Sequence, residues 1–442
     1  HVVRFTIFCP CLLVSAAFLK WPWRRHSSSS AQKPPKNSQL TPMLKHLLSK
    51  IKSTGPITVA EYMREVLTNP VMGYYLHKDM LGADGDFVTS PEISQIFGEL
   101  LGVWCVSEWM AAGKPKAFQL VELGPGRGTL TSDVLRVGVQ SYPYSGLLIG
   151  SGHIIECHKK LQTAAALTYI KQAFNLSSGR GRPWYIEISL KPGLEVPWHR
   201  VIHFFPLGYA FYLAHEFFDA LPIHKFQKTE KGWREVLIDL DPQVPHNLRF
   251  VLAPSPTMAS KTLLQAGEKR EHVEVCPDAG VIIQRLTDRI FEHGGAVLIA
   301  DYGHTGIKTD TFRGFCGHKL HDVLTAPGTA DLTADVDFSY LQRMTEGKVA
   351  TLGPITQQQF LRNMGIDLRL QVLLRNVTDS ITHKHLTGGY DMLMNPKKMG
   401  ERFKFFSLLP HSRLSTLTKE KSSNKHGPPS PPVAGFRHLA FE

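Results

Sequence analysis

The chain of 442 residues has little of what defines several large classes of protein. It has six cysteines and no C-x-x-C pair, which excludes a disulfide framework and a zinc ribbon and favours a reducing compartment. No uncharged apolar run reaches the ~20 residues that a membrane-spanning helix needs. Its 43% hydrophobic and 20% charged residues are typical of a folded protein, which excludes disorder over the whole length.

Acidic residues are missing from the first 60 positions, where nine Lys and Arg residues have no counter-charge. Residues 396–442 carry nine more basic residues against three acids, so the net charge of +12 comes from the two ends. The part between them, 61–395, has a net charge of −3. A nucleic-acid partner requires a basic folded part. We therefore expect no nucleic acid among the partners.

The same acid-free start indicates targeting. Residues 1–40 contain Arg24-Arg25 and the serine run Ser27–Ser30, which are marks of a mitochondrial transit peptide. The apolar stretch Phe5–Leu19 also fits a secretory signal, but Arg and Ser continue after it. This order favours import into the mitochondrial matrix.

Hydrophobic spacing divides the rest of the chain. Helical spacing predicts a helical N-terminal region over 41–115, with a helix start at Ser90-Pro91-Glu92. From 116 to 410, continuous apolar runs that end in a polar residue predict buried parallel strands between helices. The runs are Ala117–Leu123, His153–Ile155, Ala210–Leu213 and Ala296–Ala300. We expect an α/β fold, a mostly parallel sheet with helices on both faces.

Two segments differ from this pattern. Residues 224–254 alternate around a T-E-K-G turn and predict an inserted antiparallel hairpin. Residues 417–442 are rich in Ser, Lys and Pro, which predicts a flexible basic tail.

A glycine-rich turn joins a predicted strand to a predicted helix in the segment L-V-E-L-G-P-G-R-G-T-L, Leu120–Leu130. A dinucleotide site would need a glycine at Thr129, and a P-loop would need Lys followed by Ser or Thr, so both are excluded. G-x-G-x-G after an acidic strand end is the pattern of class I S-adenosylmethionine-dependent methyltransferases. A purely structural loop remains the alternative. The candidate cofactor-binding residues of this turn are Glu122, Gly124, Gly126 and Gly128.

Glu156 ends the next apolar run and is a candidate to accept hydrogen bonds from the ribose hydroxyls of a nucleotide. It follows Gly124 by 32 residues, more than the ~20 that such sites have, and Gly138–Gly152 reads as an insertion that accounts for the excess. A solvated acid at a strand end is the alternative.

Five segments together resemble the MidA-like family of class I methyltransferases. The most specific are the strings E-F-F-D-A-L-P and T-A-D-L-T-A-D-V-D-F. The five segments are Gly85–Ile93, Val121–Leu130, Ala214–Pro222, Ile299–His304 and Gly328–Phe338, and the resemblance covers about 41–410. It implies a Rossmann-like fold and S-adenosyl-L-methionine as the cofactor.

The mitochondrial members of this family are arginine methyltransferases that act in the assembly of respiratory complex I. The resemblance therefore implies a protein substrate, a core complex I subunit of the peripheral arm, and symmetric dimethylation of an arginine. A guanidinium stays protonated at any accessible pH, so carboxylates must hold it and accept its proton.

Glu216 and Asp219 follow a predicted strand where a doubly wound sheet opens its ligand crevice. We expect Glu216 to hold the guanidinium and Asp219 to assist it or to hold the loop. Helix capping by both is the alternative. The H-E-x-x-D sequence is not H-E-x-x-H, and we expect no metal.

Three other acids, Asp331, Asp335 and Asp337, lack the spacing of a calcium loop. Helix capping and surface solvation explain them better. His304 is a minor candidate for the cleft.

Two other functions stay open. One is a cofactor-binding assembly chaperone or scaffold with little or no turnover. The other is a methyltransferase of RNA or a small molecule, although the charge of the folded part argues against RNA. The sequence leaves the oligomeric state open.

Overall fold

The computed structural model describes residues 40–77, 85–86, 88–141, 150–155, 186–188, 207–414 and 433–436. Of the predicted transit peptide it describes Leu40 alone, and Glu156 lies outside these residues. Within them, no helix combines the length and the apolarity needed to cross a membrane.

The central sheet has the strand order β15-β16-β10-β5-β2-β3-β4, with β14 paired to β10. Its strands are β2 (Phe118–Leu123), β3 (Gly150–Ile155), β4 (Ile186–Ile188), β5 (Ala210–His215), β10 (Gly295–His304), β14 (Val336–Asp337), β15 (Ala350–Thr356) and β16 (Phe403–Leu409). Strands β2, β3, β4, β5, β10 and β14 pair in parallel, whereas β16 and β15 pair antiparallel. The prediction of a mostly parallel sheet is confirmed.

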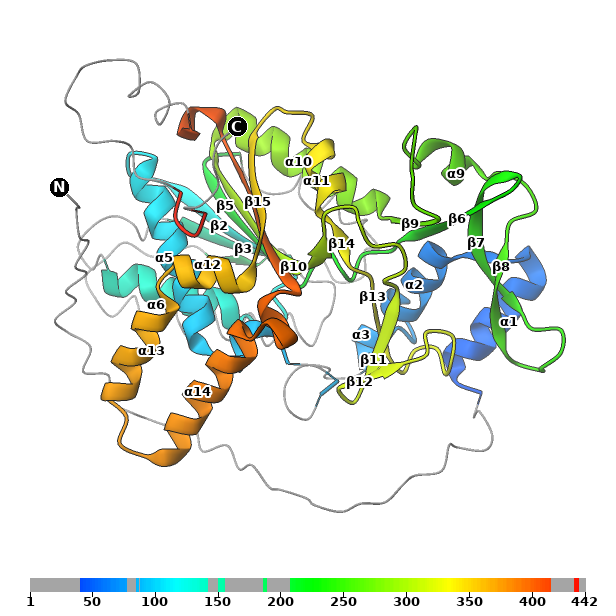
Figure 1. Cartoon of the computed structure of the whole chain (residues 1–442), viewed down its shortest axis with the longest axis horizontal. Helices are drawn as coiled ribbons and strands as arrows, with labels where there is room; N and C mark the ends of the chain where they lie inside the picture. Colours follow the sequence, from blue (N-terminus) through cyan, green and yellow to red (C-terminus); the bar gives the residue numbers. More distant parts are fainter. Residues whose placement is uncertain are drawn as a thin grey trace. The chain divides into compact units, whose positions relative to one another are not determined.

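Helices cover both faces of this sheet because successive side chains of a strand point to opposite sides. Helices lie on both sides of the central strands (Figure 1). Phe211 and Leu213 of β5 pack with one group of helices, whereas Tyr212 and Ala214 pack with the other. The first group is α5 (Gln95–Ala111), α6 (Thr129–Ser141), α12 (Gln357–Asn363), α13 (Ile366–Arg375), α14 (Ser380–Met394) and η3 (Pro396–Gly400). The second group is α10 (Pro277–His293) and α11 (Phe338–Met344).

A second, antiparallel sheet contains the predicted hairpin and extends beyond it. Its order is β1-β7-β6-β9, with β8 also on β7. The strands are β1 (Ile57–Thr58), β6 (His224–Thr229), β7 (Gly232–Leu240), β8 (Leu248–Leu252) and β9 (His272–Val275), and α9 (Met258–Thr262) lies between the last two in sequence. The hairpin of β6 and β7 is where the alternation predicts it, but the sheet also takes strands from outside 224–254.

The predicted helical N-terminal region serves both sheets. Helices α1 (Pro42–Thr54), α2 (Val59–Thr68) and α3 (Tyr74–His77) share a hydrophobic core with β7, whereas α5 packs on the central sheet. The helix predicted to run on from Ser90 is broken. Short α4 (Ser90–Ile93) ends before Ser94, whose hydroxyl accepts the Ile96 N–H and caps α5.

A third sheet has the strand order β12-β11-β13 and comes between β10 and β14 in the sequence. Its strands are β11 (Arg313–Cys316), β12 (Lys319–His321) and β13 (Asp331–Thr333).

The prediction of a flexible tail over 417–442 is wrong for residues 433–436. Val433 is 1% and Phe436 2% exposed, and the ring of Phe436 meets that of Phe360 on α12. Asn363 donates to the carbonyl of Gly435 at 2.8 Å. Apolar side chains thus hold this part of the tail against the first helical layer.

Candidate active site

The glycine-rich turn joins β2 to α6, as predicted. Gly124, Gly126 and Gly128 have φ values of 67°, 52° and 76°, a left-handed backbone that side chains with a Cβ rarely adopt. A Cβ on Gly124 would lie 3.1 Å from the ring of Phe217. The glycines are therefore required by the turn, and they leave its backbone open to close approach by a ligand.

Glu122 lies at the end of β2, one residue before the strand's last position, and is 4% exposed. Its carboxylate accepts a hydrogen bond from the Thr131 hydroxyl of α6. This acid thus lies beside the glycine-rich turn, where the pattern of class I methyltransferases predicts the cofactor. Of the five predicted cofactor residues, four therefore meet at one end of β2, and Glu156 lies outside the described residues.

The loop after β5 carries both predicted catalytic acids. Glu216 has φ 48°, and its N–H donates to the Ala300 carbonyl of β10 at 3.1 Å. One carboxylate oxygen of Asp301 accepts hydrogen bonds from the N–H groups of the three residues that follow Glu216, at 3.1, 2.9 and 3.4 Å. Its other oxygen accepts the N–H of Tyr302 at 2.9 Å. Asp301, at the end of a neighbouring parallel strand, thus fixes the loop that presents Glu216 and Asp219.

Four carboxyl groups lie largely buried at this edge of the sheet. The side chain of Glu216 is 14% exposed, and the other three residues are 6%, 0% and 4% exposed: Asp219, Asp301 and Asp331. Burial, followed by the charges of Asp219 and Glu92, raises the pKa of Glu216 well above its usual range. Burial and the carboxyls of Asp301 and Asp331 do the same for the pKa of Asp219.

The other two acids are shifted in the same direction. Burial raises the pKa of Asp301 to about 8, against the lowering effect of its backbone donors. Burial raises the pKa of Asp331 to about 6, although the Tyr75 hydroxyl donates to it at 2.9 Å. Positive charge nearby comes from Arg313, which lowers the pKa of Asp219 but is itself paired with Asp335 at 2.6 Å. The acids thus exceed the cations beside them.

An ion pair connects the glycine-rich turn to this acidic edge. Arg127 lies within the turn, and its Nη1 is 3.2 Å from Oε1 of Glu92 on α4. Glu92 is close enough to Glu216 to raise its pKa. The glycine-rich turn and the loop that carries Glu216 therefore both lie near Glu92.

Sequence reasoning missed Asp301 and Asp331 as members of the site. The prediction of surface solvation is wrong for Asp331, which is buried beside Asp219, because β13 crosses to the end of β5, as the Ala334 N–H bond to the Asp219 carbonyl shows. The prediction of helix capping is confirmed for Asp337, whose side chain accepts the Tyr340 N–H at the start of α11. His304 accepts the Gly306 N–H at 3.0 Å and holds its own loop. The segments A-D-Y-G and A-D-L-T place these acids within β10 and at the start of β13, and no local signal indicates that they lie together.

Metal ions have no obvious place here. Among the described residues no three His, Cys, Asp or Glu side chains are arranged to bind one.

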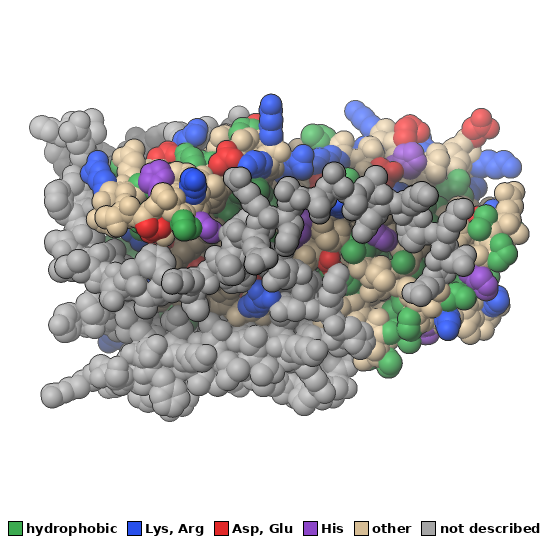
Figure 2. Space-filling view, turned by 90° about the horizontal axis from the view of Figure 1, so that it is seen from below, with side chains coloured by type: hydrophobic (Ala, Val, Ile, Leu, Met, Phe, Trp, Pro, Cys, Tyr) green, Lys and Arg blue, Asp and Glu red, His purple; other side chains and the backbone are tan. Residues whose placement is uncertain are grey.

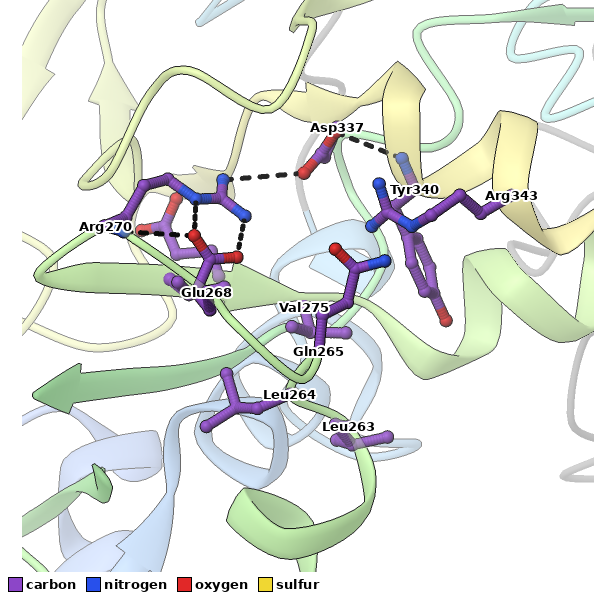
Figure 3. A pocket seen from close by; sticks show the side chains of 11 residues that line it. Leu263, Leu264, Gln265, Glu268, Arg270, Val275, Asp337, Tyr340 and Arg343 are labelled. Carbon is purple, nitrogen blue, oxygen red and sulfur yellow. Dashed lines mark hydrogen bonds and ion pairs between the residues drawn. The ribbon is translucent and has the colours of Figure 1, made fainter. Parts of the chain in front are cut away.

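A pocket lies apart from the acids, beside β9 and α11 (Figure 3). Arg270 crosses it, bonded to both oxygens of Glu268 at 2.9 and 2.8 Å and lying 3.5 Å from Asp337. Tyr340 and Arg343 of α11 form another wall. None of the predicted site residues lines this pocket.

Charged side chains of both signs lie on the face of the molecule drawn in Figure 2. In Figure 2, Lys and Arg lie interspersed with Asp and Glu over the described part of this face. This mixture agrees with the near-neutral charge of 61–395.

The fold is that of a methyltransferase, and a family profile described as S-adenosyl-L-methionine-dependent methyltransferase matches residues 100–355. The match covers more than half of the chain, which therefore belongs to this family. Among its relatives is the protein arginine methyltransferase NDUFAF7, mitochondrial, of Homo sapiens, 60% identical over 433 residues and 98% of both chains. The Mus musculus protein of the same name is 60% identical over 97% of this chain and 98% of its own.

More distant comparisons agree. The NDUFAF7 homolog of Drosophila melanogaster is 46% identical over 85% of this chain and 87% of its own. A crystal structure of a Burkholderia thailandensis protein bound to S-adenosyl-homocysteine superposes with a TM-score of 0.68 at 23% identity. It covers 86% of this chain and 95% of its own, and it shows the shared fold.

The predicted family resemblance, enzyme class and S-adenosylmethionine cofactor are confirmed. The predicted mitochondrial location and arginine specificity agree with the names of the relatives.

Proposed function

We propose that this protein transfers the methyl group of S-adenosyl-L-methionine to a guanidinium nitrogen of an arginine in a mitochondrial protein. The observation that supports the acceptor most directly is the set of buried carboxyls around Glu216. A guanidinium is always charged and presents five N–H donors, so it suits a site where acids exceed cations. Lysine loses its charge more readily when buried and offers no planar fork.

The bound cofactor supplies a methyl group already activated on a sulfonium, so the chain's residues have to hold, orient and deprotonate the acceptor. Glu122 and the three glycines are the residues proposed to hold the cofactor at the end of β2. Glu156 remains a predicted partner of its ribose. Orientation of this kind can supply roughly 7–11 kcal/mol of the barrier reduction.

In this mechanism Glu216 grips the guanidinium and accepts its proton, and Asp219 provides a second carboxylate. Both carboxyls have a raised pKa, chiefly because they are buried, so the free site holds protons. An entering cation favours the charged carboxylates and lowers their pKa values. Binding therefore expels a proton and leaves Glu216 as a base in contact with the acceptor. Asp301 keeps both acids in place through the loop amides.

We further propose that the substrate is a core complex I subunit of the peripheral arm and that the product is symmetric dimethylarginine, formed in the mitochondrial matrix. The MidA-like resemblance supports this choice. The relatives named above carry mitochondrial protein arginine methyltransferase in their names. The methylation then supports the assembly of complex I.

A labelling experiment tests the proposal. Full-length protein is incubated with methyl-labelled S-adenosylmethionine and mitochondrial extract, and Glu216→Ala is the control. We expect label on arginine of a peripheral-arm subunit, identified by mass spectrometry, and none with the variant. Label on lysine or RNA would overturn arginine as the acceptor, and intact cofactor binding without any label would favour the scaffold alternative.

A further inference from the structure

His215 is the last residue of β5 and precedes the proposed catalytic Glu216. It is 7% exposed, and its ring is stacked on Phe403, with the centroids 6.0 Å apart and the planes at 16°. The ring of Phe97 meets it edge-on at 5.1 Å. The two phenylalanines fix the plane of the imidazole, so packing decides where its nitrogens point.

One nitrogen of this ring makes no hydrogen bond to the described part of the chain. This atom, Nε2 of His215, is buried, and Oε1 of Glu216 lies 3.5 Å from it. An unsatisfied buried polar atom destabilises a fold, and phenylalanine would fill this aromatic space without that penalty. Burial lowers the pKa of His215 to about 3, so the ring is neutral and carries one N–H. A neutral donor beside the acid requires an explanation other than packing.

The charged groups around Glu216 leave this donor role to His215. The titratable groups that face Glu216 come from α4, the β5 loop, β10 and β13, and all but the tyrosine are acids: Glu92, Asp219, Asp301, Tyr302 and Asp331. The backbone of Ser90 donates to it as well. A lysine or arginine in the place of His215 would neutralise Glu216 and repel a cationic acceptor. A neutral N–H can orient the carboxylate without competing for it.

We propose that His215 is a positioning residue whose Nε2–H donates to the Glu216 carboxylate and holds it in the orientation that grips the guanidinium. The inference rests on the proposed function, because it assigns Glu216 the grip. Hydrogen bonds of this kind tighten when the substrate binds, and a distance of 3.5 Å in the free protein leaves room for that change.

The test compares His215→Phe, which keeps the aromatic shape, with His215→Gln, whose amide can place a donor near the position of Nε2. Full-length proteins are assayed with an arginine peptide for binding, kcat and KM across pH. We expect His215→Phe to bind the peptide about 10- to 100-fold more weakly, the worth of one bond to a charged group. Its kcat/KM profile should shift to higher pH, and its Tm should stay equal or rise. His215→Gln should restore most of the binding.

A role in packing alone would instead lower the Tm of His215→Phe and leave the pH profile unchanged, and this result overturns the inference. Nitrogen-15 NMR of labelled histidine gives a reading independent of turnover. We expect a proton on Nε2 whose shift changes in Glu216→Gln, and an unprotonated Nε2 would overturn the inference. A wild-type protein that binds and methylates no arginine peptide contradicts the proposed function, whereas the NMR result still decides whether His215 donates to Glu216.

Discussion

The antiparallel sheet and the edge of the central sheet both bury acids, but the groups that surround these acids differ. Glu235 on β7 is 1% exposed and accepts from His224 at 2.6 Å and from Thr257 at 2.5 Å. Glu274 on β9 receives the Thr311 hydroxyl and two backbone N–H groups, which oppose the rise that burial causes in its pKa. At the end of β5, by contrast, Glu216 faces mainly other acids.

The difference separates acids whose charge is compensated by groups of this chain from acids whose charge a bound cation would compensate. A buried carboxylate with its own donors stabilises the fold, because its charge is compensated within the chain. A group of buried carboxyls that exceeds its cations raises its own pKa values and destabilises the protein at neutral pH. Such a group is typical of a functional site, where a bound cation compensates the charge of the carboxylates. The predictions below test this contrast.

The largest effect is expected when one acid of each kind is replaced by glutamine. Glu216→Gln should lower kcat/KM for an arginine peptide by about 10²- to 10⁴-fold, because it removes the base, and should leave stability equal or higher. Glu235→Gln should keep activity per folded molecule and lose about 1–3 kcal/mol of stability, because His224 and Thr257 lose a charged acceptor. Kinetics and denaturant unfolding of both variants check this. Inactive, stable Glu235→Gln would contradict the contrast.

A smaller effect is expected at the glycine-rich turn. Gly126→Val introduces a β-branched side chain at φ 52°, and we expect S-adenosylmethionine affinity to fall at least about tenfold, in line with ~1–3 kcal/mol of backbone strain. Gly113→Val is the matched control, since Gly113 has φ 82° and no atom within 4 Å of an added Cβ. Calorimetry measures both. Equal affinities of the two variants would remove the turn from the cofactor site.

The pH dependence of stability should have opposite signs at Glu268, in the loop before β9, and at Glu216. The Arg270 pair lowers the pKa of Glu268 to about 2, so its stabilisation is full above the unfolded pKa near 4.5 and is lost as pH falls towards 2. Glu216 has a raised pKa, so the folded state binds the extra proton and loses stability as pH rises from about 4.5 through that pKa. Wild type should therefore lose stability relative to Glu216→Gln on going to higher pH, and relative to Glu268→Gln on going to lower pH. Parallel curves for the two variants would be incompatible with this account.

The smallest effect is expected in the pocket beside α11. Arg343 is exposed and stacks over Tyr340 at 5.9 Å, away from the proposed acceptor acids. Arg343→Ala should change stability by no more than about 0.5 kcal/mol and leave kcat/KM unchanged. A marked rise in KM for the peptide would show that the acceptor site extends into this pocket.

Much of the central sheet could be predicted because its signals are local. Continuous apolar runs mark β2, β5 and β10, and the glycine-rich turn marks the junction of β2 and α6. The strand-end position of Glu216 follows from the same runs. These features depend on neighbours within a few residues, so a single sequence displays them.

What the sequence did not reveal depends on contacts between distant segments. Nothing near Asp331 indicates that it lies beside Asp219, and nothing near Arg127 indicates Glu92 on another helix. Phe436 looks like part of a polar tail until Phe360 is placed beside it. Alternation predicted the hairpin but could not show that β1 would join it. Periodicity reports which side of an element is buried and not what it is buried against.

The central claim is that a bound guanidinium compensates the charge of the acids around Glu216. The number of protons released on binding tests this claim directly. Calorimetry of an arginine peptide with the full-length protein and S-adenosyl-homocysteine, repeated in buffers of different ionisation enthalpy, counts them. We predict release of protons near neutral pH, less release with Glu216→Gln, and no binding of the matched citrulline peptide. Binding of the arginine peptide without proton release, or equal binding of the citrulline peptide, would contradict the account.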